Sequence, residues 1–257
     1  MRVVFLGTAG YHPNESRQTA CVMVPELGIV FDAGTGFFRV RDYLETPELH
    51  VFLSHYHWDH VIGLTFLIDV AYGKDLCSVH CYGRDPIRHT LRRLFRDPFF
   101  PVGLAQHSCT VRCHGVSDAR WARQGRRGWQ IGDALVSALL CPHPSGGSFA
   151  YALTARGRKI VYITDTTVSP ALTSFVADAD LLICEANFPN AFRELALKTG
   201  HSYPEIVAGL ARAAHVKRLV VFHVSPLLPD PEVLVSEARE IFSGPIDLAH
   251  DRMEIDV

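Results

Sequence analysis

The sequence lacks the features that would place the protein outside ordinary globular chains. The 25 lysine and arginine residues nearly balance the 27 aspartate and glutamate residues, so no overall charge points to nucleic acid or to a membrane surface. No apolar stretch reaches the roughly 18 residues that a membrane-spanning helix needs. A signal peptide and low-complexity segments are also absent. We therefore expect a cytoplasmic protein without a membrane partner.

The cysteines are too scattered along the chain to form a network of disulfide bonds. The seven cysteines are odd in number and spread over 257 residues, which excludes a disulfide framework. Cys77 and Cys81, like Cys109 and Cys113, lie in apparent strands, where residues four apart share one face about 13 Å from each other. This spacing favours buried strand cysteines, and a structural zinc site is the alternative.

Apolar residues make up 48% of the chain and charged residues 20%, which excludes a disordered protein. Both halves contain apparent strands followed by alternating helices and strands, which predicts an α/β sandwich with helices outside. Ser202 and Glu205 form a capping-box pattern at the start of one helix. Strands are expected at 2–6, 20–24, 28–32, 50–54, 77–82, 149–155, 159–164, 181–184 and 218–222, and helices at 59–71, 85–96, 170–177, 202–214 and 231–242, before a C-terminal hairpin.

Histidine is the residue present in excess, with 14 copies. His55, His57, Asp59 and His60 crowd into six residues directly after an apolar strand. Such a cluster is costly to bury without partners, and histidine is the commonest metal ligand in proteins. A metal site is therefore favoured over a solvated polar loop.

The pattern His-x-His-x-Asp-His after a strand resembles the metallo-β-lactamase superfamily. Four further motifs follow that family's order: Phe31 to Gly36, His143 between two prolines, Asp165 in Tyr-Ile-Thr-Asp-Thr, and His223 in Phe-His-Val-Ser-Pro. The resemblance covers nearly the whole chain. It implies a single domain over residues 1–257 with the αββα four-layer sandwich of that family.

The resemblance also implies a dinuclear metal-dependent hydrolase that uses a metal-bridging hydroxide as nucleophile. Asp59 then belongs to the catalytic residues as well as to the metal ligands. The donors are all nitrogen or oxygen, so two Zn²⁺ ions fit, with Mn or Fe as alternatives. In the implied ligand sets His55, His57 and His143 bind one metal, Asp59, His60 and His223 bind the other, and Asp165 bridges both.

Two further residues resemble the ribonuclease Z-like and small phosphodiesterase branch. The resemblance implies that His201 serves the departing oxygen and that Glu185 orients its ring. In the alternative, His201 only packs before a helix and Glu185 is a salt-bridge partner. Asp32 is implied to accept a hydrogen bond from a ligand imidazole, or else is a turn residue. Arg17 lies near the site by resemblance, or in a solvated loop.

The spacing of the motifs bears on the substrate. In ribonuclease Z an arm that binds tRNA lies between the third and fourth motifs, but here only 22 positions separate His143 from Asp165. The sequence thus argues against tRNA and favours a small phosphodiester or nucleotide-like substrate. A lactonase or thioesterase of the same fold is the alternative, followed by a non-catalytic nucleic-acid-binding relative. A homodimer is left open, because relatives commonly form dimers.

Three weaker signals are left open. Trp58, inside the metal motif, either lines the site or packs. Residues 98–130 show little periodicity and are the candidate segment to cover the site. Arginines could attract a polyanion, although a solvated surface is favoured for them; they lie in residues 84–96 and at Arg120, Arg123, Arg126 and Arg127.

Overall fold

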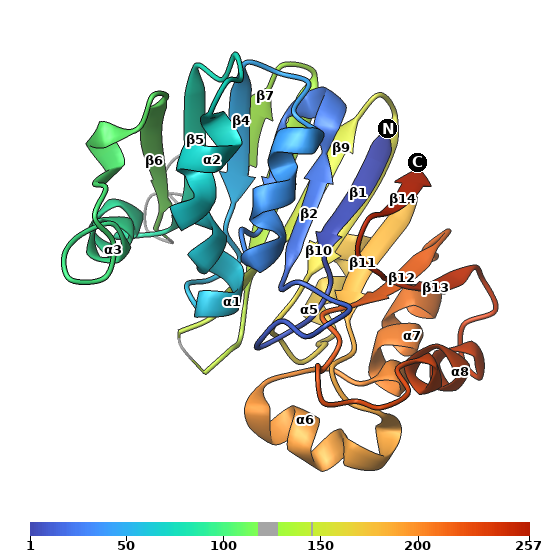
Figure 1. Cartoon of the computed structure of the whole chain (residues 1–257). Helices are drawn as coiled ribbons and strands as arrows, with labels where there is room; N and C mark the ends of the chain where they lie inside the picture. The colour runs from blue at the N-terminus through green and yellow to red at the C-terminus, as the bar shows by residue number, and fades with distance from the viewer. Residues whose placement is uncertain (118–127, 145) are drawn as a thin grey trace. The chain divides into compact units, whose positions relative to one another are not determined.

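The computed structural model describes residues 1–117, 128–144 and 146–257 (Figure 1). The chain divides into two compact units, and the expectation of a single domain stays a prediction. The first unit comprises Met1–Gly7, Gln18–Arg127 and Arg252–Asp256, and the second comprises Thr8–Arg17, Gly128–Asp251 and Val257. The four arginines at 120–127 lie outside the described residues.

The described part of the first unit contains one seven-stranded mixed sheet. Its strands, in spatial order, are β14 (Met253–Asp256), β1 (Arg2–Gly7), β2 (Cys21–Val24), β3 (Ile29–Phe31), β4 (Glu48–Phe52), β5 (Ser78–Arg84) and β6 (Thr110–Val116). Neighbours are antiparallel from β14 to β3 and parallel from β3 to β6. The carboxyl ends of β3, β4 and β5 therefore meet at one edge.

One face of this sheet is covered by helices. Alternate strand residues such as Val30, Val51 and Val79 pack with Phe37 and Leu67 from the helical segments in one buried cluster, which is the period-two pattern of a strand with a buried face. The helical segments are η1 (Pro25–Leu27), η2 (Thr35–Asp42), α1 (Trp58–Val61), η3 (Ile62–Phe66), α2 (Leu67–Ala71), α3 (Ile87–Leu94) and η4 (Leu104–Gln106).

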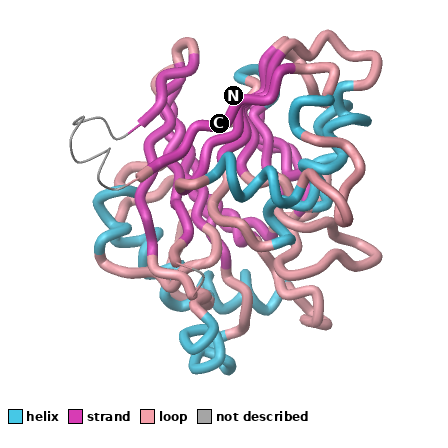
Figure 2. Tube along the Cα trace, turned by 90° about the vertical axis from the view of Figure 1, so that its left-hand side faces the viewer, coloured by secondary structure: helices cyan, strands magenta, loops and turns pink. Residues whose placement is uncertain are grey.

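The described part of the second unit likewise contains a seven-stranded mixed sheet. In spatial order its strands are β13 (Ile246–Leu248), β12 (Leu219–Phe222), β11 (Leu181–Glu185), β10 (Arg158–Ile163), β9 (Ser148–Ala155), β8 (Ala134–Cys141) and β7 (Gly128–Ile131). The run from β13 to β10 is parallel and the rest is antiparallel. The carboxyl ends of β10, β11 and β12 therefore share one edge. Figure 2 shows the strands in magenta and the loops and turns in pink.

Helices cover one face of this sheet too. Val161 and Leu182 from the strands pack with Val176, Val207 and Leu234 from the helices, and α7 and α8 lie side by side (Figure 1). The helical segments are α5 (Ala171–Val176), η5 (Asn190–Phe192), α6 (Arg193–Thr199), α7 (Pro204–Ala213) and α8 (Glu232–Arg239). The α/β class expected from the sequence is confirmed.

Some local expectations were wrong. The helix expected at 59–71 is divided into α1, η3 and α2. Residues 128–141, where no strand was expected, form β7 and β8. The C-terminal hairpin does not form, since β13 pairs with β12 and β14 with β1. The described part of residues 98–130 contains η4, β6 and β7, so it is more regular than expected.

The capping box is also wrong. Helix α7 begins at Pro204 with Tyr203 as its N-cap, and no side chain of the expected box caps it. The Ser202 hydroxyl instead donates to the Thr166 carbonyl at 2.7 Å, and Asn190 Oδ1 accepts from the Glu205 backbone at 3.0 Å. In the described part of the chain no helix is both long and apolar enough to cross a membrane.

Candidate functional site

The expected ligands divide between the two units, four in the first and three in the second. Most of them follow parallel strands at their carboxyl ends, where sites in α/β sheets gather, while His143 follows the antiparallel strand β8. Asp32 follows β3, Asp165 follows β10 by two residues, and His223 follows β12. All three have left-handed backbones, with φ of 57°, 51° and 53°. Non-glycine residues adopt this conformation at a cost of about 1–3 kcal/mol, often at functional sites.

In the first unit the histidine motif is built around a buried carboxylate. Asp32 has no exposed surface, and its Oδ2 lies 2.8 Å from Nδ1 of His60. Ser54 donates to Asp32 through its backbone N–H at 2.7 Å and its hydroxyl at 2.8 Å. The bond expected between Asp32 and an imidazole is therefore present. The role of Ser54 was missed, since a serine carries no signal for it in the sequence.

The remaining donors of this motif lie together. Nε2 of His60, the nitrogen not held by Asp32, is 3.2 Å from Oδ2 of Asp59. The ring of His55 lies 4.3 Å from those of both His57 and His60, between centroids. Tyr56, between the two histidines, donates its hydroxyl to the Arg84 carbonyl at the end of β5. The loop thus presents three imidazoles and one carboxylate from a fixed backbone.

In the second unit Asp165 is the centre of the cluster. Its Oδ2 lies 3.2 Å from Nε2 of His223, and its Oδ1 lies 3.8 Å from Nε2 of His143. Thr164 donates its hydroxyl to Oδ2 at 2.6 Å. The other nitrogen of His143 lies 3.3 Å from the Gly200 carbonyl. Each imidazole therefore has one nitrogen toward the carboxylate and the other toward a backbone or side-chain partner.

His201 and Glu185 form the expected pair. Nδ1 of His201 is 2.8 Å from Oε2 of Glu185, while Oε1 accepts the Thr166 backbone N–H at 2.8 Å. Burial on its own would raise the pKa of Glu185, but His201 and, to a smaller extent, His223 together outweigh it and lower that pKa. Burial would likewise lower the pKa of His201, but Glu185 raises it. The pair therefore favours the protonated imidazole.

The loop around His201 is held by contacts that the sequence did not reveal. The Ser202 hydroxyl accepts from the Val168 backbone at 3.0 Å, and the Thr167 hydroxyl donates to the His201 carbonyl at 3.2 Å. Gly200 has a left-handed φ of 78°, and a Cβ there would lie 2.6 Å from Cδ of Pro144. Glycine is thus required where this loop passes the residue after His143.

These donor sets fit a divalent metal ion. Donor atoms of Asp165, His201 and His223 all lie within 4.8 Å of one another. His60 is held through Nδ1 by a carboxylate, which is how proteins orient imidazoles that bind metal through the other nitrogen. Nitrogen and oxygen donors of this kind bind zinc and related divalent ions.

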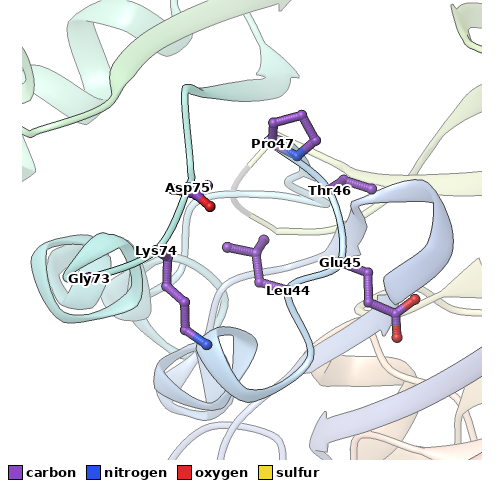
Figure 3. A pocket seen from close by; sticks show the side chains of 7 residues that line it. All are labelled: Leu44, Glu45, Thr46, Pro47, Gly73, Lys74 and Asp75. Atoms are coloured by element: carbon purple, nitrogen blue, oxygen red, sulfur yellow. The ribbon is translucent and has the colours of Figure 1, made fainter.

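Other candidates fall outside these clusters. Arg17 is half-buried and donates to the Thr8 hydroxyl at 2.7 Å and to the Ala249 carbonyl, so it is neither a loose loop residue nor in contact with the expected ligands. Trp58 is 61% exposed and is not a core residue. A surface pocket of about 350 Å³ (Figure 3), lined by residues 44–47 and 73–75, contains none of the expected site residues.

In the part of the chain that the structure describes, none of the clusters of possible metal donors includes a cysteine. Cys81 and Cys109 are buried as expected. Cys113 is half-buried, and Cys77 is exposed, which corrects the expectation that all four are buried. Cys77 and Cys109 each directly precede a strand, β5 and β6.

Comparison with known proteins decides the family. The model of the beta-lactamase superfamily domain matches residues 28–224. Ribonuclease Z of Prochlorococcus marinus (strain MIT 9313) is 30% identical, over 100% of this chain and 98% of that protein. The chain belongs to the metallo-β-lactamase superfamily, in its ribonuclease Z-like branch. It is accordingly a metal-dependent hydrolase of the phosphodiesterase-like kind.

Solved structures show the same metallo-β-lactamase fold. The metallo-beta-lactamase fold protein YhfI from Bacillus subtilis aligns with a TM-score of 0.80 at 20% identity, covering 99% of both chains. The short form of human tRNase Z aligns with a TM-score of 0.78 at 24% identity, covering 100% of this chain and 99% of that one. The alignment with the Prochlorococcus ribonuclease Z spans 320 positions against 257 residues here, so that relative contains residues without a counterpart in this chain.

Proposed function

We propose that this member of the ribonuclease Z-like branch is a dinuclear metal-dependent phosphodiesterase for small phosphodiester or nucleotide-like substrates. The observation that carries the proposal is the pair formed by the buried Glu185 and the half-buried His201, which lies beside Asp165 in the second unit. A hydrolase that expels an alkoxide gains from a positioned proton donor, and the branch supplies the phosphodiesterase-like chemistry.

The proposed ligands are those expected from the sequence. His55, His57 and His143 bind one ion, Asp59, His60 and His223 bind the second, and Asp165 bridges them. Support comes from the family and from the donor clusters within each unit. Two Zn²⁺ ions are proposed, with Mn and Fe as alternatives for the same donors. When bound, such ions activate water and neutralise charge on a phosphoryl oxygen.

His201 is proposed as the proton donor rather than a ligand. Its Nδ1 is the atom that lies 3.9 Å from Asp165 Oδ1, and that nitrogen already donates to Glu185. The bond to Glu185 orients the ring, so that Nε2 is the nitrogen left to give its proton to the leaving oxygen. Asp59, next to His60, is proposed to take part in catalysis as well as in binding.

A small substrate is proposed because the chain between the third and fourth motifs is short. Residues 148–163 form strands β9 and β10, joined by a tight turn at Arg156 and Gly157. The described residues between His143 and Asp165 thus contain no arm for tRNA.

The test is a metal-loaded substrate screen. Purified protein is assayed for bound metal and then with bis(p-nitrophenyl) phosphate, cyclic nucleotides, short RNA, lactones and thioesters in Zn²⁺ or Mn²⁺. We expect phosphodiester hydrolysis that falls in His201→Ala while the metal content stays at the wild-type level. The control is Asn190→Ala, which removes a helix-capping side chain without touching the cluster.

Other outcomes select the alternatives. Metal-loaded protein that opens lactones or thioesters but ignores phosphodiesters contradicts the proposal. Protein that binds no metal under replete conditions supports a non-catalytic relative. A cytoplasmic location and a homodimer remain predictions, and light scattering of the purified protein tests the second.

A further inference from the structure

Asn187 contacts the ring of one proposed ligand from the side opposite Asp165. It lies two residues beyond β11, and His223 lies one residue beyond β12, its parallel neighbour. The amide nitrogen Nδ2 of Asn187 is 3.2 Å from Nδ1 of His223. Asn187 is 6% exposed, and its backbone N–H donates to the Ser202 carbonyl at 3.1 Å. The side chain is therefore held in place beside the imidazole.

The protonation of His223 determines which end of the amide faces it. Nε2 of His223 points toward Asp165, so a metal bound on that side takes the lone pair of Nε2. A neutral imidazole then carries its hydrogen on Nδ1. An N–H group must face an acceptor, and the NH₂ end of an amide is only a donor.

Turning the amide by 180° resolves this conflict. The two ends of an asparagine amide have nearly the same shape, and their assignment follows from the hydrogen-bond partners. In the part of the chain that the structure describes, the Asn187 side chain makes no other hydrogen bond. The turn therefore breaks nothing and places Oδ1 opposite Nδ1–H of His223.

Glu185 is a weaker acceptor for the same hydrogen. Its Oε2 lies 3.5 Å from Nδ1 of His223, outside the usual range for an N–H···O bond. The same oxygen accepts from His201 at 2.8 Å, and Oε1 accepts from Thr166. The carboxylate is thus engaged with the proposed acid, and Asn187 is the nearer of the two groups to Nδ1 of His223.

We propose that Asn187 is a positioning residue that accepts the Nδ1 hydrogen of His223 through Oδ1 and so directs Nε2 toward the metal. It also leaves Oε2 of Glu185 to accept from His201. The inference rests on the proposed function, because it takes His223 as a ligand. Partners of this kind are worth about 10–100-fold in metal affinity.

The test compares Asn187→Leu, which has similar volume but no acceptor, with Asn187→Asp, which keeps one. Zn²⁺ affinity is measured by competition with a chromophoric chelator. We expect the dissociation constant to rise about 10–100-fold in N187L and to stay near the wild-type value in N187D. In Zn²⁺-loaded protein, ¹H–¹⁵N spectra of the histidine rings should show the Nδ1–H form of His223 in wild type and N187D.

Controls separate a metal effect from a folding effect. Asn190→Leu also removes one asparagine acceptor, that of the Glu205 N–H, and should leave the Zn²⁺ affinity unchanged. Asn187→Ala is measured beside N187L, so that a misfolded leucine variant does not decide the result. If the wild-type protein binds Zn²⁺ and N187A or N187L binds it with the same affinity, the inference is overturned while the proposed function stands. Wild-type protein that binds no Zn²⁺ overturns the proposed function and the inference with it.

Discussion

The Nδ1 atom of His201 lies 2.8 Å from Oε2 of Glu185, a carboxylate with no exposed surface. Because this bond occupies Nδ1, the proton available to a substrate is the one on Nε2. We predict that His201→Ala lowers kcat about 10²–10⁴-fold for a phosphodiester whose leaving group is an aliphatic alcohol. The loss should be smaller for a p-nitrophenyl ester, because a nitrophenolate departs with little need of a proton.

Steady-state assays of both substrates with the same metal-loaded preparations measure this difference. Glu185→Gln keeps the shape of the side chain and removes its charge, so it should follow the same leaving-group pattern with a smaller loss. Metal content should not change in His201→Ala. Equal losses on the two substrates would contradict a role in leaving-group protonation.

The Asp32 carboxylate accepts hydrogen bonds from three groups of the first unit's histidine motif: the backbone N–H and the hydroxyl of Ser54, and Nδ1 of His60. Asn at this position cannot accept from all three, because its NH₂ end is a donor. We predict that Asp32→Asn weakens Zn²⁺ binding about 10–100-fold and lowers Tm. Chelator competition and thermal melts measure the two effects. Asp247→Asn removes a partly exposed partner of Arg218 and should leave Zn²⁺ binding unchanged; an equal loss there would refute the prediction.

Gly10 lies against the ring of His223. A Cβ at this position would be 2.5 Å from Cε1 of that ring, and the Gly10 backbone is fixed by its N–H bond to the Val224 carbonyl at 3.0 Å. We predict that Gly10→Ala displaces the imidazole and lowers both metal affinity and activity. Gly209→Ala, in helix α7 with open space around the site of the added methyl, is the matched control.

That control should gain about 0.4–1 kcal/mol of unfolding free energy, since alanine restricts the unfolded chain. Its metal affinity and activity should match those of wild type. A Gly10→Ala variant that binds metal as wild type does would show that the ring tolerates the added carbon.

The chemistry-bearing residues could be predicted from sequence because their pattern is local. A run of apolar strand residues followed at once by Asp32, Glu185 or His223 places a polar side chain at a strand end, whatever the rest of the chain does. The structure confirms these positions, and it shows the expected contacts of Asp32 with His60 and of Glu185 with His201.

The residues that support them were missed because their role depends on distant partners. Ser202 fits a capping box by spacing, yet its hydroxyl bonds Thr166 and Val168, 36 and 34 positions away. Asn190 caps α7 from 15 positions away. Asn187 and Ser54 act only through the rings they meet after folding. Long-range hydrogen bonds of this kind leave no periodicity in the sequence.

Asp180 provides a test of pH dependence away from the metal ligands. Its carboxylate accepts from the Lys159 backbone at 2.8 Å, from Lys217 at 2.8 Å and from Arg158 at 3.1 Å. Burial would raise the pKa of Asp180, but these donors outweigh it and lower the pKa. A lowered pKa in the folded state stabilises the protein above the ordinary carboxyl range and loses that effect as pH falls through the lowered value.

We therefore predict that Asp180→Asn lowers Tm at pH 6–7, and that the difference from wild type shrinks below about pH 4. Thermal melts at pH 3–7 measure it, and any acid-induced loss of metal is common to both proteins, so the difference isolates Asp180. Asp133→Asn is the control, because its ion pair with Arg156 is exposed and 3.6 Å long, and such pairs add little stability. A difference for Asp180→Asn that stays constant down to pH 3 would mean that the carboxylate charge is not what these donors stabilise.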